Sequence, residues 1–483
     1  MEQIIAILVA LFFLYKIIQR RKTYKSLFWV FAGMLLLNGA IVVFTSPILM
    51  LIHRWLIFSF VIAVVIQKRT FRSEWSAFPF KRLLIFLIIC SFVIAIVDDR
   101  LTSFYKLYIP FNDVVETHLL LLAGYAAVRE VDDMQKLLKR LFIVFVFVGI
   151  YGIFNWITQT NPYYEWVIKH FFVGGEEDME MKLRTLDVDP SDGRFRATST
   201  FYATFVYGFV ASLFALLYFA YKSRKKYLKY IGIAAGFVGT FLCFSRTVLG
   251  AAFFACVAFL FLSKNFTKQV KIGLAALIAG ICLYSFVPPV QEMVDNTLDV
   301  FLTGGESALG STVEMRQVQF LGASKYFSQS PVFGNGYGYI NKELGWGNRD
   351  NARLDESMAG FESIIYQLMI EQGVIGLLCF LLLYGALIVF FLRKRKVNKE
   401  FTALGLAVVM LYLAFSIGTG PLGVTSVTML VLGAIIKTIV LSTPKIAEIE
   451  DPAAIPEIAT YEPVRIRPTK VPKMRFKNSM SFS

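Results

Sequence analysis

The chain has 483 residues, of which 57% are hydrophobic and only 17% are charged. A soluble chain of this kind would carry roughly 25% charged residues, so the composition excludes an ordinary soluble enzyme. The net charge of +15 would favour nucleic acid as a partner of a soluble protein. Here the basic residues cluster between apolar runs, as topology signals do in membrane proteins. The composition therefore predicts an all-α polytopic membrane protein that binds no nucleic acid.

The apolar runs predict about 12–13 transmembrane helices. The expected ranges are 3–18, 27–44, 48–66, 83–97, 114–128, 141–157, 200–220, 229–244, 247–262, 272–287, 363–392, 401–416 and 422–441. The first run is followed by Arg20, Arg21 and Lys22. A cleaved signal peptide carries its basic residues before the apolar run, so we expect a retained anchor.

Basic clusters alternate with pairs of apolar runs, and this spacing predicts the topology. The clusters are Arg20–Lys25, Lys68–Arg72 with Lys81 and Arg82, Arg129–Arg140, Lys222–Lys229, Lys264–Lys271 and Arg393–Lys399. Basic loops stay in the cytoplasm. An N-terminus outside and a C-terminus inside place every one of these clusters in the cytoplasm.

This topology divides the chain into a transmembrane domain, residues 1–441, and a cytoplasmic tail, residues 442–483. The domain contains two long outer loops, 158–199 and 288–361, and loops of such length are usually functional or disordered. The second loop is rich in glycine and aromatic residues, so we expect a large folded extracytoplasmic cap. The tail has spaced prolines and late basic residues, which predict a flexible segment that associates with the lipid surface.

The cysteines and histidines give no signal for a disulfide framework or a metal site. All cysteines lie in apolar runs, and no Cys/His cluster has the spacing of metal ligands. The cysteines are Cys90, Cys243, Cys256, Cys282 and Cys379. We therefore expect neither a metal nor a cofactor.

Several arginines break the charge rule, because the predicted topology puts them outside. They are Arg194, Arg196, Arg246 and Arg316. Arg246 stands between two apolar spans, where a cation is costly unless it is paired or functional. Arg246 could instead snorkel to the headgroups. Arg194, Arg196 and Arg316 could instead be solvated loop charges. Because guanidinium groups grip phosphate oxygens in pairs, several that converge at the outer surface would suit the diphosphate of a lipid carrier.

Two glutamates accompany the span that begins near residue 363. Glu362 opens this span from the outside, and Glu371 lies about two and a half helical turns deeper. Glu362 could simply be solvated, or it could serve as a base. Glu371 is expected to be structural, holding a neighbouring helix or a loop amide. Gly373 and Gly376 follow at a spacing that suits close helix packing.

Four segments in order resemble the O-antigen ligase and polymerase family of bacterial membrane glycosyltransferases. They are "RFRATSTFYATFVYGF", "FLCFSRTVLGAAFFACVAFLF", "MRQVQFLGASKYFSQSPVFGNGYGYI" and "ESIIYQLMIEQGVIGLLCFLL". These segments run from residue 194 to about 385, while the first half of the chain shares only its hydropathy with the family. At Glu362 the family usually has a histidine, so the identity of the base differs from the family pattern.

The resemblance implies metal-independent glycosyl transfer on the outer face of the bacterial inner membrane. The donor would be a polyprenyl-diphosphate-linked oligosaccharide, such as one on undecaprenyl diphosphate, and the acceptor a sugar hydroxyl. Arg194, Arg196, Arg246 and Arg316 would bind the diphosphate, Arg246 would also assist catalysis, and Glu362 would be the base. Further implied partners are membrane lipid and a flippase or chain-length regulator.

Three functions are therefore weighed. A polymerase of surface-polysaccharide repeat units is favoured, because glutamate replaces the ligase-typical histidine. A ligase that moves the finished polysaccharide to a lipid or cell-wall acceptor uses the same chemistry. A transporter or flippase of lipid-linked sugar would show inverted repeats and charged residues at the bilayer midplane, and the sequence shows neither.

Overall fold

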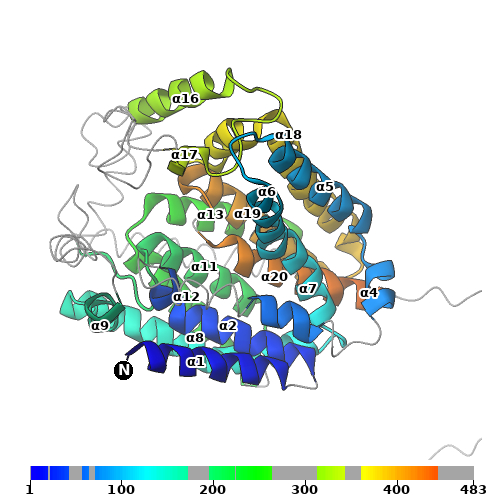
Figure 1. Cartoon of the computed structure of the whole chain (residues 1–483). Helices are drawn as coiled ribbons and strands as arrows, with labels where there is room; N and C mark the ends of the chain where they lie inside the picture. The colour runs from blue at the N-terminus through cyan, green and yellow to red at the C-terminus, as the bar shows by residue number, and fades with distance from the viewer. Residues whose placement is uncertain are drawn as a thin grey trace, which may run out of the picture. The chain divides into compact units, whose positions relative to one another are not determined.

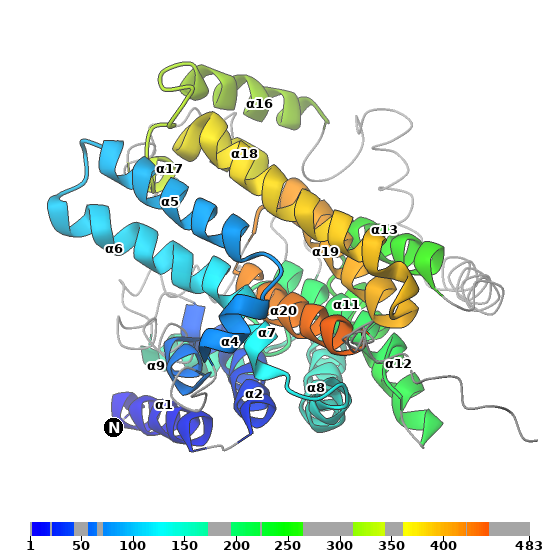
Figure 2. The ribbon, with the colours of Figure 1, turned by 90° about the vertical axis from the view of Figure 1, so that its right-hand side faces the viewer.

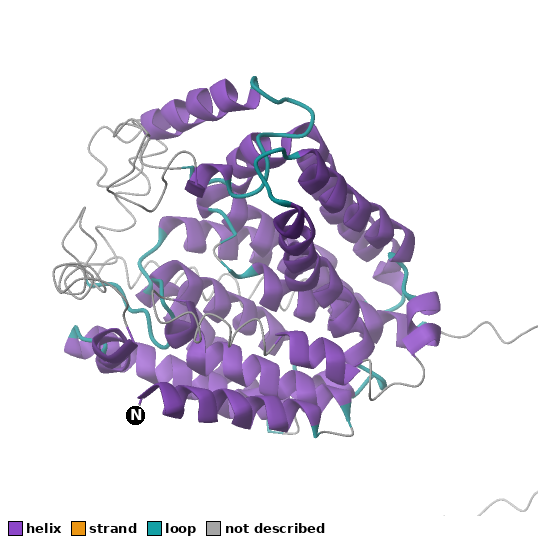
Figure 3. Ribbon diagram, in the orientation of Figure 1, coloured by secondary structure: helices purple, strands orange, loops and turns teal. Residues whose placement is uncertain are grey.

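The computed structural model describes residues 2–19, 22–42, 57–64, 71–171, 195–222, 225–263, 313–342, 361–421 and 423–443. By its internal contacts the chain divides into two units, Met1–Thr443 and Pro444–Ser483, and all described residues belong to the first. These residues form helices and connecting loops, and no β-strand occurs among them (Figure 3). The predicted tail lies outside the described residues except for its first two positions.

The helices have the following bounds. They are α1 (Glu2–Ile18), α2 (Thr23–Val42), α4 (Phe71–Ala77), α5 (Lys81–Val97), α6 (Ser103–Asp113), α7 (Leu119–Ala127), α8 (Asp133–Thr158), α9 (Pro162–Phe171), α11 (Thr204–Phe219), α12 (Lys226–Leu242), α13 (Arg246–Leu262), α16 (Val313–Phe327), α17 (Tyr339–Lys342), α18 (Ile364–Arg393), α19 (Lys399–Thr419) and α20 (Thr425–Leu441). A π-helix, η1 (Val114–His118), joins α6 to α7, and a 3-10 turn, η4 (Lys394–Lys396), follows α18.

Three of the described helical stretches are long and apolar enough to cross a membrane: Asp133–Thr158, Ile364–Lys396 and Lys399–Thr419. Shorter apolar helices accompany them, among them α11, α13 and α20. The peripheral helices carry exposed apolar side chains, for example Leu378 and Leu381 on α18, and lipid is the solvent that suits such a face. The prediction of an all-α polytopic membrane protein is confirmed.

The predicted spans coincide with helices wherever the structure describes them, with one instructive difference. The range 114–128 covers only the second half of a helical stretch that runs from Ser103 through η1 to Ala127. Its first half, α6, mixes Lys106 and Asp113 with aromatic side chains, so its hydropathy is too low to mark a span. The range 272–287 and residues 48–56 lie outside the described residues.

Central helices are buried almost all round, and small residues let them approach closely. Nearly every residue of α11 and α20 is buried, and α19 is buried along most of its length. A Cβ on Gly124 of α7 would lie 2.2 Å from the carbonyl oxygen of Leu430 on α20. A Cβ on Gly433 of α20 would lie 2.1 Å from the carbonyl oxygen of Leu121. These two glycines allow the backbones of α7 and α20 to touch (Figure 2).

Ion pairs and helix termini distinguish two ends of the helix bundle. At the basic end, Lys222 pairs with Glu400 at 3.0 Å and Lys437 of α20 pairs with Glu74 of α4 at 2.6 Å. At the opposite end lie the N-termini of α13 and α18 and the C-terminus of α19, with α16 packed on α18 (Figure 1). We call this opposite end the site end. The charge rule predicts that the site end faces outside and the basic end faces the cytoplasm.

Candidate active site

Helix α18 is interrupted at Gly373. The interruption exposes backbone groups to which an earlier segment of the chain binds. Gly373 has φ 61° and ψ −153°, a conformation that L side chains rarely adopt. The break leaves the carbonyls of Ile370 and Glu371 and the N–H groups of Val374 and Ile375 without their regular helical partners. These groups would be costly in a membrane protein unless other backbone groups paired with them.

The loop over residues 331–336, which carries the "PVFGNG" motif, supplies the missing partners. The bonds are Asn335 N to Ile370 O at 2.7 Å, Gly336 N to Glu371 O at 2.9 Å, Val374 N to Pro331 O at 2.9 Å and Ile375 N to Val332 O at 3.2 Å. The side chain of Asn335 also donates to Ile370 O at 3.0 Å and to Tyr326 O at 2.9 Å. The glycine-rich motif and the "EQG" motif of α18 therefore form one docking joint.

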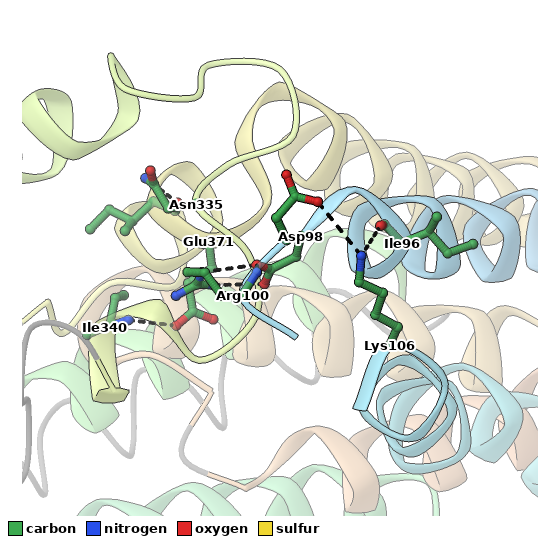
Figure 4. Close-up of polar contacts among 9 residues, drawn as sticks. Ile96, Asp98, Arg100, Lys106, Asn335, Ile340 and Glu371 are labelled. Carbon is green, nitrogen blue, oxygen red and sulfur yellow. Dashed lines mark hydrogen bonds and ion pairs between the residues drawn. The ribbon is translucent and has the colours of Figure 1, made fainter. Parts of the chain in front are cut away.

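An ion pair from the end of α5 lies under this joint (Figure 4). The guanidinium of Arg100 donates to both carboxylate oxygens of Asp98, at 3.0 Å and 2.8 Å, and the Asp98 side chain is only 3% exposed. A Cβ on Gly336 would lie 1.9 Å from Asp98 Oδ2. The carboxylate of Glu371 accepts a hydrogen bond from Ile340 N at 3.2 Å. Glu371 thus holds a backbone amide in the first turn of α17, which fits the structural role expected from the sequence.

A buried tyrosine anchors the same loop from its other side. Tyr337 packs with Ile94, Ala95 and Leu101 at the end of α5. Burial raises the pKa of the Tyr337 hydroxyl well above its usual value. The loop is therefore fixed to both α5 and α18.

The docked loop brings α16 over the start of α18, where two of the predicted site residues meet. Arg316 Nη2 lies 2.7 Å from Glu362 Oε2 and also donates to Gly418 O at the end of α19, at 2.8 Å. Arg316 Nη1 donates to Gln319 Oε1 at 3.3 Å. Both members of the pair are partly exposed. The structure thus places a cation and a carboxylate side by side at the site end.

Arg246 belongs to the same region through its neighbour Thr247. A Cβ on Gly418 would lie 2.3 Å from Thr247 Cγ2, so the first turn of α13 touches the residue whose carbonyl binds Arg316. Ser245 caps α13, because its hydroxyl accepts from Val248 N at 3.4 Å. The N-terminus of this helix adds partial positive charge where Arg246 stands.

Arg196 lies against the turn that leads into α13. The adjacent residue, Ala197, donates its backbone N–H to Leu242 O at 3.1 Å, which fixes this segment beside the end of α12. Thr198 and Ser199 are held by Asn161, with bonds of 2.6 Å and 2.9 Å. Arg194 lies outside the described residues.

Other residues at the site end were not identified from the sequence. Arg100 was detectable by the criterion used for the other arginines, since "VDDRLTS" puts a basic residue in a predicted outer loop. Gly418 and Gly420 carried a weaker signal, the glycine-rich "IGTGPLG" after the span at 401–416. Gln319 and Tyr366 gave no signal in the sequence, because an isolated amide or phenol belongs to no motif with a recognisable spacing.

No group of three or more His, Cys, Asp or Glu side chains that could hold a metal occurs in the part of the chain that the structure describes. The polar groups that meet beside Gly418 are the Arg316 guanidinium, the Glu362 carboxylate and the Gly418 carbonyl. Such a set can bind an anionic group and accept a proton.

Part of the chain matches a known protein family. Residues 231–381, roughly a third of the chain, match the family model Wzy_C, described as O-antigen ligase. No curated protein matches the chain. Residues 231–381 are therefore similar to an O-antigen ligase domain, and the resemblance seen in the sequence is confirmed over this segment. Arg246, Arg316 and Glu362 all fall within the matched residues, which supports glycosyl transfer in polysaccharide synthesis.

Proposed function

We propose that the protein transfers glycan from a polyprenyl-diphosphate carrier to a sugar hydroxyl, at the outer face of the bacterial inner membrane. The observation that carries the proposal is the Arg316–Glu362 pair, 2.7 Å apart at the end of α19 and beside the first turn of α13. The pair places a cation that can stabilise the leaving diphosphate beside a carboxylate that can take the proton of the incoming hydroxyl. We further propose that the reaction needs no metal and that it joins repeat units, as in a polymerase.

The chemistry follows from these groups. The acceptor oxygen attacks the anomeric carbon, and the bond from that carbon to the diphosphate oxygen breaks. The bonding electrons leave with the diphosphate, whose growing charge Arg316, Arg246 and Arg196 would stabilise. The hydroxyl proton passes to the Glu362 carboxylate. Arg194 is proposed as a fourth phosphate ligand on the strength of its sequence position.

The ion pair also suggests an order of events. In the structure Arg316 is engaged by Glu362 and by Gly418 O. A diphosphate is a stronger partner for a guanidinium than a single carboxylate, because it offers more charge and more acceptor oxygens. Donor binding would draw Arg316 toward the phosphates and leave the Glu362 carboxylate able to receive the acceptor hydroxyl.

The test uses the purified protein in lipid nanodiscs, the lipid-linked oligosaccharide of the source cell, and a chelator. Glu362→Gln should lower turnover by roughly 10²–10⁴-fold, the usual worth of a general base. Glu362→His should restore part of it, with a pH optimum shifted toward the imidazole pKa of about 6.5. The matched control is Glu400→Gln at the basic end, which should turn over like the parent.

Three results would contradict parts of the proposal. If Glu362→Gln turns over like the parent, Glu362 is not the base. If the chelator abolishes transfer, a metal takes part. If the parent moves lipid-linked glycan across a vesicle membrane without forming a glycosidic bond, the protein is a transporter. Deletion in the cell separates the two enzymes, because loss of a polymerase leaves single repeat units and loss of a ligase leaves full chains on the carrier.

A further inference from the structure

A groove of about 410 Å³ opens beside the Arg316–Glu362 pair. Arg316, Gln317, Phe320, Leu321 and Tyr366 line it, so α16 forms one wall and the first turns of α18 form the other. This volume is within the usual range of small-ligand sites, about 300–1,000 Å³. The mechanism described above uses Arg316 but assigns no role to the other lining residues.

Two aromatic rings from different helices face this groove. The ring centroids of Phe320 and Tyr366 are 6.2 Å apart with an interplanar angle of 51°. The Tyr366 hydroxyl donates to Arg316 O at 3.4 Å, which ties α16 to α18 at this point. Phe320 is 50% exposed. A half-exposed aromatic face held beside polar donors is a surface that another molecule can cover.

The groove offers no further charge for a second ligand. Its single guanidinium, that of Arg316, is paired with the Glu362 carboxylate at 2.7 Å and is the group that the proposed mechanism assigns to the donor diphosphate. The side-chain amide of Gln317 adds a donor and an acceptor without charge. A lipid tail would fill the aromatic part but would offer no hydrogen-bond partner to the Gln317 amide, which is costly. The groove therefore suits a neutral ligand that has both an apolar face and hydroxyl groups.

A sugar ring has these two properties. Its carbon-bound hydrogens form an apolar face whose partial positive charge matches the negative face of an aromatic ring. Its hydroxyls can bond to the side-chain amide of Gln317. We propose that this groove is the acceptor-sugar subsite, with Phe320 and Tyr366 as its stacking platform. The assignment to the acceptor rests on the proposed function, because the sugar beside the base Glu362 is the one that gives up a hydroxyl proton.

The experiment measures binding without turnover, on the full-length protein in nanodiscs and without donor. The probe is the lipid-free oligosaccharide released by mild acid from the cell's own lipid-linked glycan. Phe320→Ala should weaken its binding about 2- to 12-fold, the worth of one aromatic contact. Phe320→Trp should retain binding and report it by a change in fluorescence. The matched control is Phe104→Ala, which removes an aromatic ring that is 67% exposed on α6.

The kinetic arm then assigns the sugar. In the transfer assay, Phe320→Ala should raise the KM for acceptor and leave the KM for donor unchanged. Equal probe binding by the parent and Phe320→Ala overturns the subsite, and so does an effect on donor KM alone. Binding that depends on Phe320 in a protein without transferase activity would refute the proposed function and leave a glycan-binding groove.

Discussion

Replacing Gly336 by alanine tests whether the loop over residues 331–336 is fixed to α18 as described. Gly336 has φ +89°, and a left-handed conformation costs alanine about 1–2 kcal/mol. The added Cβ would lie 1.9 Å from Asp98 Oδ2 and 2.5 Å from Arg100 Nη2. Either the loop or the ion pair must move, and a displaced charge-assisted hydrogen bond adds about 1.5–3 kcal/mol. The expected loss of stability is therefore about 3–5 kcal/mol.

The assay is thermal unfolding of the detergent-solubilised protein at a fixed scan rate, since unfolding of such proteins is often irreversible. By the usual scaling with chain length, Gly336→Ala should lower the apparent Tm by about 3–8 °C. The control is Gly385→Ala, a helical position in α18 where a Cβ meets nothing within 4 Å. It should keep or raise the Tm, because alanine stabilises a helix by about 0.5–1 kcal/mol relative to glycine. A Gly336→Ala protein that melts with the parent would refute the docking joint.

Three further predictions follow from the other contacts. Arg246→Lys should lose most glycan product at unchanged membrane abundance, since a point charge cannot replace a guanidinium fork; retained activity would favour headgroup snorkelling. Glu371→Gln should cost about 1–3 kcal/mol and lower Tm rather than kcat, because Ile340 N loses a charged acceptor; unchanged Tm would refute this. A reporter active only outside should work when inserted within 343–360 and fail after Lys396; the reverse pattern would overturn the topology.

The sequence alone determined the fold class, because the hydrophobic effect acts on composition and run length. Apolar runs near the length of a bilayer must become helices, since only helices satisfy their own backbone in lipid. The ranges 83–97 and 401–416 therefore matched α5 and α19 within a few residues. Where polar and charged residues interrupt an apolar run, as in α6, the same rule missed the element.

For the candidate site, the sequence identified charged residues whose placement at a membrane boundary costs free energy. Arg246, Arg316 and Glu362 stood out because charged groups at a membrane boundary need a reason. Their spacing, 70 residues from the first to the second and 46 from the second to the third, gave no information on distance. Only the tertiary structure placed Arg316 2.7 Å from Glu362 and put the first turn of α13 against Gly418.

The docking joint shows why that information was missing. The four backbone bonds between residues 331–336 and the interrupted α18 depend on a left-handed Gly373. Backbone hydrogen-bond partners across a loop are chosen by geometry, and any residue except proline can donate them. The motif letters "FGNG" and "EQG" were visible in the sequence, but their pairing was not. Local chemistry thus set which residues are available, and the packing of α5, α16 and α18 decided which of them meet.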